Sequence, residues 1–360
     1  MIDFSSLNQV QQAARSMIQS DLRFLYTVTR HIDPSKSNYI PSLLPYLGVV
    51  IDGAEDWVKA VNNSCKNKLP IPQFTRDEEK FYEQIRISVK LWQQDYDAIY
   101  DLLEQAYSES DHYFGSICKP IAQKLHLYDI YGVDTVNGAL CGNTILCRYY
   151  SPFFQYDGNN GEYVKSMAKI GGEYIALFNA LREYQVDDTL NFDVCDYGGF
   201  VKSPVGNDFS DRFVLFSILC QINFLIFCID RWIKEEMPTK LRFAYLLYYS
   251  LLNVIPQIND KLGTCFILDD QWKNDKFRNA MAHYKLGVAL KNKDLLHDDI
   301  MFGLTEHILG AEYRVVKESI YAQLEKLAIQ IGNYLGLGKA WLFQTGGSKT
   351  LTTLLPVYYF

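Results

Sequence analysis

The sequence predicts an all-α protein with two helical domains. Apolar residues recur at intervals of three and four through most of the chain, which is the spacing of amphipathic helices. The 360 residues are 48% apolar and 21% charged, as expected for a soluble protein with more than one domain. Glycine, proline and acidic residues interrupt this pattern at 187–208. We therefore predict a helical N-terminal domain (1–186), a linker or long loop (187–208), a helical bundle (209–338) and a C-terminal tail (339–360).

Helices of ordinary length are expected in the first half. The periodic apolar residues begin at Leu7, and the first helix should end before Asp33-Pro34 because a residue that precedes proline disfavours helical backbone. The longest periodic segment, 77–109, predicts one amphipathic helix with Phe81 and Trp92 facing the core. The predicted helices are 5–31, 42–62, 77–109, 118–128, 136–150 and 162–184, with a proline-containing loop at 66–75.

The second half contains two strongly apolar segments. Residues 213–229 are interrupted by polar residues and fall short of the roughly 20 residues that a membrane span needs, so we expect a helix buried in a bundle. A second apolar helix, 241–255, should end at Pro256. A long amphipathic helix, 305–335, should close the bundle. The tail after 339 would add a short strand or pack on a partner.

A short helix is expected between these elements, at 269–287. Most of its residues favour helix formation. Asp269 and Asp270 are available as N-terminal caps, and Gly287 is available as a C-terminal stop. The sequence therefore predicts a helix of about four turns.

Three side chains of this helix suit chemistry on a phosphodiester. Asn279 and His283 are four residues apart and share a helical face, and Arg278 lies one position round the helix. An imidazole transfers protons near neutral pH, a guanidinium binds phosphate oxygens in two places, and an amide orients either group. We therefore predict a catalytic site formed by Arg278, Asn279 and His283.

The segment 278–283, with the sequence RNAMAH, resembles the signature of the HEPN superfamily. That signature is an Arg, a spacer of a few residues and a His, commonly with a polar residue directly after the Arg; here the spacer is four residues long and begins with Asn279. The resemblance implies that the C-terminal half is a compact all-α domain. It also implies a homodimer with two motifs facing each other across a twofold axis. The implied activity is metal-independent RNA cleavage in a toxin–antitoxin, abortive-infection or related defence system.

The charge of the chain restricts how it would contact RNA. A net charge of −7 argues against a protein that coats nucleic acid non-specifically. Residues 271–293 nevertheless contain six basic residues and one acidic residue. Three of these lysines surround the motif, so we predict Lys273, Lys276 and Lys285 as RNA-binding residues. A solvated, lysine-rich face is the alternative.

No metal site and no cofactor are expected. The eight cysteines form no Cys-x-x-Cys pair, and no spacing of cysteine and histidine indicates zinc. Gly198-Gly199 lacks the Lys-Ser or Lys-Thr that follows in a nucleotide-binding loop. Reduced thiols and an N-terminus without a basic segment and an apolar run favour a cytoplasmic protein.

The expected function is therefore that of a metal-independent endoribonuclease of a toxin or antiviral-defence type. His283 would act as general base or acid, and Arg278 would stabilise the charge on the scissile phosphate. Asn279 would hold the side chain of Arg278 or His283 in position. The expected partners are an RNA substrate, a second copy of the chain and an antitoxin or other regulatory protein, with no membrane. The alternatives are a non-catalytic HEPN-like module that binds RNA or a nucleotide, and a helical scaffold in a defence complex.

One HEPN toxin group has a tyrosine near the motif that a partner nucleotidyltransferase modifies, one spacer residue after the His. In this chain Tyr284 directly follows His283 and Lys occupies position 285. The hydroxyl is therefore rotated by about 100° from the modified position. We do not expect this route of silencing here.

Overall fold

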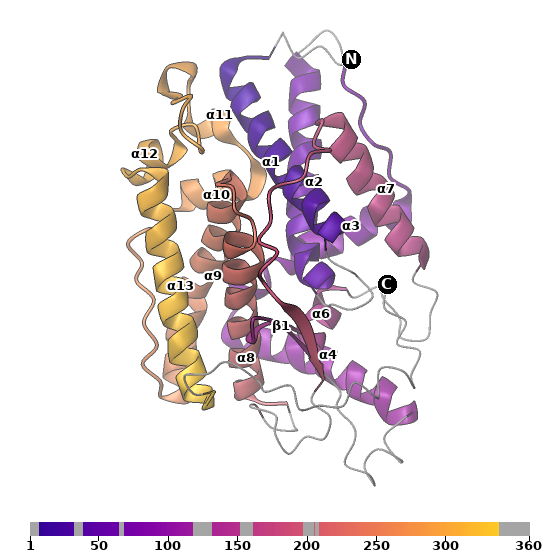
Figure 1. Ribbon diagram of the computed structural model, residues 1–360, viewed down its shortest axis with the longest axis vertical. Helices are drawn as coiled ribbons and strands as arrows, with labels where there is room; N and C mark the ends of the chain where they lie inside the picture. The colour runs from indigo at the N-terminus through magenta and orange to yellow at the C-terminus, as the bar shows by residue number, and fades with distance from the viewer. Residues whose placement is uncertain are drawn as a thin grey trace.

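The computed structural model describes residues 7–31, 39–64, 68–117, 132–151, 161–196, 205 and 209–337. Within these ranges the chain is mostly helical, as predicted, with one small sheet. Several of the long helices run along the longest axis, with α13 (Tyr313–Leu335) on one side and α7 (Gly161–Leu177) on the other (Figure 1). Between them lie α9 (Pro238–Leu262) and α1 (Gln9–His31).

The first two predicted helices are confirmed as α1 and α2 (Tyr39–Ser64). A reciprocal cap starts α1, because the Asn8 side chain accepts a hydrogen bond from the Gln11 amide (2.8 Å) and the Gln11 side chain accepts one from the Asn8 amide (3.0 Å). Both helices pack on the second half of the chain. The ring of Phe243 lies edge-on to Phe24 of α1 and is stacked on Tyr46 of α2, with centroid distances of 6.2 and 4.2 Å.

The single long helix predicted at 77–109 is wrong. The chain forms α3 (Arg76–Ser88), a 3₁₀ turn (Leu91–Gln93) and α4 (Tyr96–Ile117). Tertiary contacts replace helical hydrogen bonds at the break, since the Tyr96 amide donates to the side chain of Gln257 (2.9 Å). Leu91 and Trp92 are buried there. The break places Gln93 beside the motif helix.

The helix predicted at 136–150 is correct only in its second part. The chain forms β1 (Gly132–Val136), β2 (Ala139–Asn143) and then α6 (Thr144–Tyr150). Asn137 and Gly138 join the strands with φ angles of 48° and 82°, the left-handed pair of a type I′ hairpin turn. The Asn-Gly pair was the sequence signal for this hairpin.

A third strand lies in the segment for which a linker or loop was predicted. This strand, β3 (Phe192–Asp196), pairs antiparallel with β1, and the strand order is β2-β1-β3. Strand β2 packs on α8 (Asp211–Asn223). The helix predicted at 118–128 lies outside the described residues.

The helix predicted at 162–184 ends earlier, and α7 stops at Leu177. Asn179 adopts left-handed backbone with φ 54°, and the Ala180 amide donates back to the Ile175 carbonyl (2.8 Å). This geometry terminates a helix in the way that a glycine would.

The apolar segment 213–229 forms the core helix that was predicted. It comprises α8 and a π-helical continuation, Phe224–Arg231. In the part of the chain that the structure describes, Asp211–Arg231 is the one helix long and apolar enough to cross a membrane. Of its most apolar 18-residue stretch, 89% is buried inside the protein. Such burial fits the core helix of a soluble protein.

Two predictions about helices in the second half are wrong, one about where a helix ends and one about whether a helix is continuous. Helix α9 continues through Pro256 to Leu262, because Val254 and Ile258 are buried and their packing offsets the hydrogen bond that proline removes. The helix predicted at 305–335 is divided into α12 (Leu304–Leu309) and α13, since Gly310 adopts left-handed backbone with φ 72°. The tail from residue 338 lies outside the described residues.

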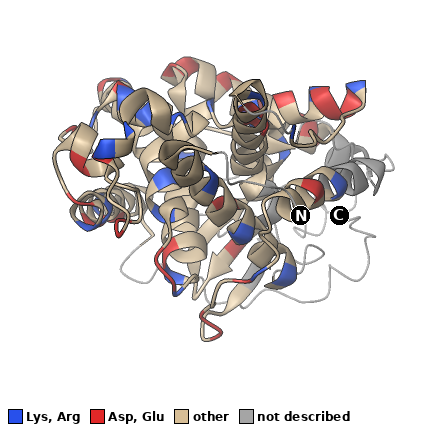
Figure 2. Cartoon of the chain, turned by 90° about the horizontal axis from the view of Figure 1, so that it is seen from above, with Lys and Arg blue, Asp and Glu red and all other residues tan. Residues whose placement is uncertain are grey.

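Charges of both signs are interspersed over the helices seen from above (Figure 2). Many pairs are exposed, such as Arg231 with Glu325 (2.8 Å) and Lys261 with Asp97 (2.6 Å). Among the described residues, Lys and Arg do not gather on one element in this view, so a contact with an anion there would have to be local.

Candidate functional site

The motif helix is shorter than predicted. Helix α10 spans Asp275–His283 rather than 269–287. Asn274 caps it by accepting a hydrogen bond from the Phe277 amide (3.0 Å), and Tyr284 ends it with φ 48°. Asp269 forms a local turn instead, because its side chain accepts a hydrogen bond from the Gln271 amide (2.7 Å).

The apolar face of α10 fixes which side chains face solvent. Phe277 and Met281 are fully buried, and the ring of Phe277 packs edge-on against Tyr245 of α9 at 4.6 Å between centroids. Helix α10 also packs on α2. Arg278 and His283 lie outside this apolar face and are half-buried.

Two hydrogen bonds hold the Arg278 guanidinium in place. Its Nη1 donates to Asn279 Oδ1 (2.9 Å), and its Nη2 donates to Gln93 Oε1 (2.7 Å). The guanidinium carbon lies 5.8 Å from the ring centroid of Tyr249. Its Nε is buried without a hydrogen-bond partner. The guanidinium is thus oriented by neutral groups, and no carboxylate hydrogen-bonds to it within the described part of the chain.

Arg278 and Asn279 line an open, polar hollow of about 320 Å³. The other lining residues are Gln93, Tyr249, Asn253 and Asp275. Tyr249 donates to Asp275 (2.5 Å), and Lys273 Nζ lies 3.5 Å from the Asn253 side-chain oxygen, near the edge of the hollow. This volume lies at the lower end of the range of small-ligand sites, roughly 300–1,000 Å³.

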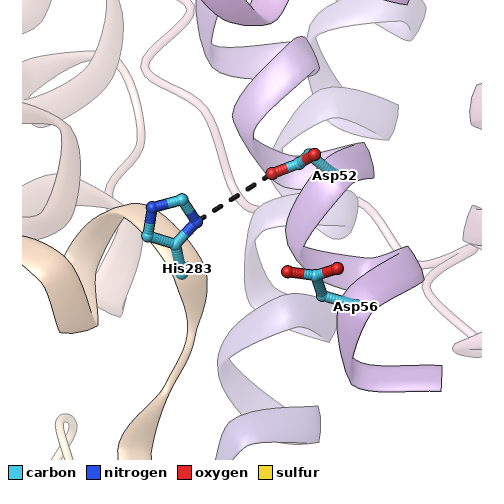
Figure 3. A group of neighbouring side chains, drawn as sticks. All are labelled: Asp52, Asp56 and His283. Carbon is cyan, nitrogen blue, oxygen red and sulfur yellow. Dashed lines mark ion pairs between the residues drawn. The ribbon is translucent and has the colours of Figure 1, made fainter. Parts of the chain in front are cut away.

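His283 faces helix α2 instead of the hollow. Its Nδ1 lies 3.9 Å from Asp52 Oδ2, and the imidazole points toward Asp52 and Asp56 (Figure 3). Burial lowers the pKa of His283 below its usual value of 6.5, and the positive charges of Lys285 and Arg278 act in the same direction, whereas Asp52 opposes them. The imidazole is therefore predominantly neutral at neutral pH, the form that accepts a proton.

The predicted site residues thus separate into two groups, one around the hollow and one against α2. Arg278 and Asn279 lie at the hollow with Lys273 near its edge, while His283 lies against α2 with Lys285 close enough to influence its pKa. Lys276 is exposed on α10. No hydrogen bond joins His283 to Arg278 or Asn279, all of which lie within the described ranges.

Sequence reasoning missed the residues that surround these groups. Gln93 reaches Arg278 from a turn that was predicted to be helix, and nothing in the sequence signals this contact. Asp52 and Asp56 are four residues apart on a predicted helix, which was a usable signal for two carboxylates on one face. Burial raises the pKa of Asp52, although Arg86 (3.4 Å) and His283 oppose this.

A buried polar network holds the end of α10. The Tyr284 hydroxyl and the Arg242 guanidinium both hydrogen-bond to Asp21, and the Arg242 guanidinium carbon lies 3.6 Å above the Tyr284 ring. Thr239 donates to the second Asp21 oxygen (2.6 Å). The network connects α1, α9 and the residue directly after His283. The Tyr284 hydroxyl is consequently inaccessible to a modifying enzyme while the protein is folded.

Comparisons with protein families, with curated proteins and with solved structures found no match for this chain.

Proposed function

We propose that this protein is a metal-independent endoribonuclease with a HEPN-like C-terminal half, active in the cytoplasm as a homodimer in a toxin or antiviral-defence system. One observation is the main support for this proposal. A guanidinium oriented by neutral groups, that of Arg278, lies at an open hollow on the same nine-residue helix as the half-exposed imidazole of His283. A cation and a proton acceptor on one rigid support are the groups that cleavage of a phosphodiester requires.

In the proposed reaction the ribose 2′-hydroxyl is the nucleophile. His283 accepts the proton of this hydroxyl while its oxygen bonds to phosphorus, and the 5′-oxygen leaves with a proton from a second acid. The products are a 2′,3′-cyclic phosphate and a 5′-hydroxyl. Arg278 stabilises the charge that develops on the phosphoryl oxygens. Gln93 and Asn279 keep the guanidinium in position.

A second copy of the chain would complete the site. In one chain His283 and Arg278 have different neighbours, so a twofold dimer that places one copy's hollow near the other copy's imidazole would supply both groups to one phosphate. His283 of the second copy would then be the base at this hollow, and a water molecule would be the acid that protonates the leaving 5′-oxygen. Light scattering at micromolar concentration should give twice the mass of the chain, and a monomer would argue against this shared site.

The decisive experiment compares RNA cleavage by the wild type and three variants. His283→Ala and Arg278→Ala should each reduce the rate about 10²–10⁴-fold, the usual contribution of a general acid–base group or an oriented charge. Asn279→Ala should have a smaller effect, because this amide only orients Arg278. Cleavage should persist in EDTA, since the nucleophile belongs to the substrate.

Matched controls are His307→Ala and Arg314→Ala, which change an exposed imidazole and an exposed guanidinium outside α10. Both should cleave like the wild type, and circular dichroism should show that every variant is folded. Folded, dimeric wild type that cuts none of a broad panel of RNAs would refute the ribonuclease.

The second candidate is a module that binds RNA or a nucleotide without cleaving it. The separation of His283 from the hollow within one chain favours it. In that case Arg278→Ala and Lys273→Ala should weaken RNA binding, as measured by fluorescence anisotropy, whereas His283→Ala should bind normally. Increasing salt should also weaken binding, because cations at the hollow contact phosphates.

A further inference from the structure

We infer that Asp52, Asp56 and His283 form a binding site for one divalent first-row transition-metal ion, for which Mn²⁺ is a suitable probe. The site lies between α2 and the C-terminal end of α10, outside the hollow around Arg278. Binding at this site does not depend on the proposed ribonuclease activity.

The three side chains approach one another from two helices. Asp52 and Asp56 lie four residues apart on α2, and His283 points toward both from α10 (Figure 3). One ligand atom from each residue lies within 4.8 Å of the other two. The distance of 3.9 Å between His283 Nδ1 and Asp52 Oδ2 is too long for a hydrogen bond.

An ion would fit between these atoms after a small movement. Metal–ligand bonds of about 2.0–2.2 Å place two donors of one ion roughly 3.0–3.6 Å apart. The cluster would therefore have to contract by about 1 Å at its widest separation. Asp56 is exposed, so a rotation of its side chain supplies this movement without disturbing the core.

A glycine of α2 allows the close approach of α2 and the end of α10. Gly53 lies next to Asp52, and a Cβ at this glycine would lie only 2.3 Å from Cδ2 of Tyr284. The absent side chain lets the Tyr284 ring pack against the α2 backbone. Since Tyr284 directly follows His283, this packing brings the imidazole up to Asp52 and Asp56.

The charges around the cluster leave one carboxylate available. Glu55 pairs with Lys59 (2.6 Å) and Asp52 pairs with Arg86 (3.4 Å). Asp56 has no hydrogen bond or ion pair within the part of the chain that the structure describes. A divalent cation would therefore gain the unpaired carboxylate of Asp56, while the positive charges of Lys285 and Arg278, which act on His283, would oppose its binding.

The donor atoms select the class of ion. Two carboxylates and one imidazole suit Mn²⁺ and other first-row divalent ions, whereas Ca²⁺ needs six to eight oxygen ligands. Three protein ligands would leave coordination positions for water. Thiols bind Mn²⁺ weakly, so the free cysteines of the chain would not compete for it.

The ion would also regulate the activity proposed above, and this consequence rests on that proposed function. Coordination through Nδ1 uses the lone pair on that nitrogen and leaves the proton on Nε2. The imidazole then has no free lone pair to accept the proton of a 2′-hydroxyl. Bound Mn²⁺ should therefore slow RNA cleavage, and EDTA should restore it.

The test titrates Mn²⁺ into the 360-residue chain and follows the loss of the free-ion signal by electron paramagnetic resonance, without RNA. Wild type should bind one ion per chain at this site. Asp56→Asn and His283→Gln should each weaken binding at least about tenfold. The matched control Glu55→Gln removes the same charge from the same helix and should bind like wild type, because Glu55 faces Lys59.

The outcomes separate this site from the proposed function. Wild type that binds no Mn²⁺ up to about 1 mM, or ligand variants that bind as tightly as Glu55→Gln, would overturn the site, whatever the RNA assays show. Site-specific binding in a protein that cuts no RNA would support the site and refute only the ribonuclease. Circular dichroism should confirm that the variants are folded, and Asp52→Asn gives a third, independent ligand change.

Discussion

We predict that breaking the buried ion pair between Asp21 and Arg242 destabilises the protein. The two side chains are 1% and 0% exposed. Burial lowers the pKa of Arg242 to about 10, so its guanidinium stays protonated at neutral pH. Asp21→Asn would remove its counter-charge, and removing one partner of a buried pair costs about 3–5 kcal/mol. The amide keeps one acceptor oxygen, so we expect a loss of about 3 kcal/mol, at the lower end of that range.

The free energy of unfolding can be measured by urea titration with tryptophan fluorescence. The matched control is Glu183→Gln, which breaks exposed pairs with Arg30 (3.5 Å) and His31 (2.9 Å). Exposed pairs contribute about 0–1 kcal/mol, so this control should unfold almost like the wild type. The comparison separates the effect of burial from the effect of losing a carboxylate.

A double variant isolates the interaction itself. Arg242→Met alone should also destabilise the protein, because the Asp21 carboxylate stays buried. Combined with Asp21→Asn, it should cost less than the sum of the single changes by about 1.5 kcal/mol. A loss below about 1 kcal/mol for Asp21→Asn, or additivity of the two changes within about 0.5 kcal/mol, would refute the reasoning.

Three further predictions concern the motif helix. Because burial lowers the pKa of His283 below 6.5, the cleavage rate should fall to half its maximum only below pH 6.5, as the imidazole gains a proton; a midpoint above 6.5 in the pH–rate profile would contradict this. Gly53→Ala should destabilise the protein by about 1–3 kcal/mol in urea titration, because the new methyl overlaps the Tyr284 ring, and unchanged stability would show that the helices can separate. Gln93→Leu removes the neutral acceptor of Arg278 and should lower kcat/KM about fivefold, equivalent to about 1 kcal/mol; an unchanged kcat/KM would show that Asn279 alone is sufficient.

The sequence by itself determined the helical character of the chain and the buried position of its most apolar segment. Periodic apolar residues identify α1 and α2, because one helical face must be buried wherever the helix packs. The apolar run at 213–229 is buried almost throughout, as its composition indicates. The motif residues Arg278, Asn279 and His283 also follow from the sequence, together with their position on one short helix.

Element boundaries were less predictable, because local signals compete with tertiary packing. Pro256 does not end α9, since buried neighbours offset the lost hydrogen bond. The segment 77–109 has a helical pattern throughout, yet contacts to Gln257 and the burial of Trp92 interrupt it. Asn137-Gly138 was a clear hairpin signal, but the apolar residues that follow it also fit a helix.

Only the tertiary structure decided which groups surround the motif. Gln93 and Arg278 are 185 positions apart in the sequence, and they meet because the break before α4 turns the chain toward α10. Asp52 and Asp56 reach His283 because Gly53 lets Tyr284 pack against α2. Helical periodicity predicts which face of a helix is apolar, but the crossing of two helices depends on all the side chains between them. The neighbours of His283, and therefore its chemistry, are properties of that packing.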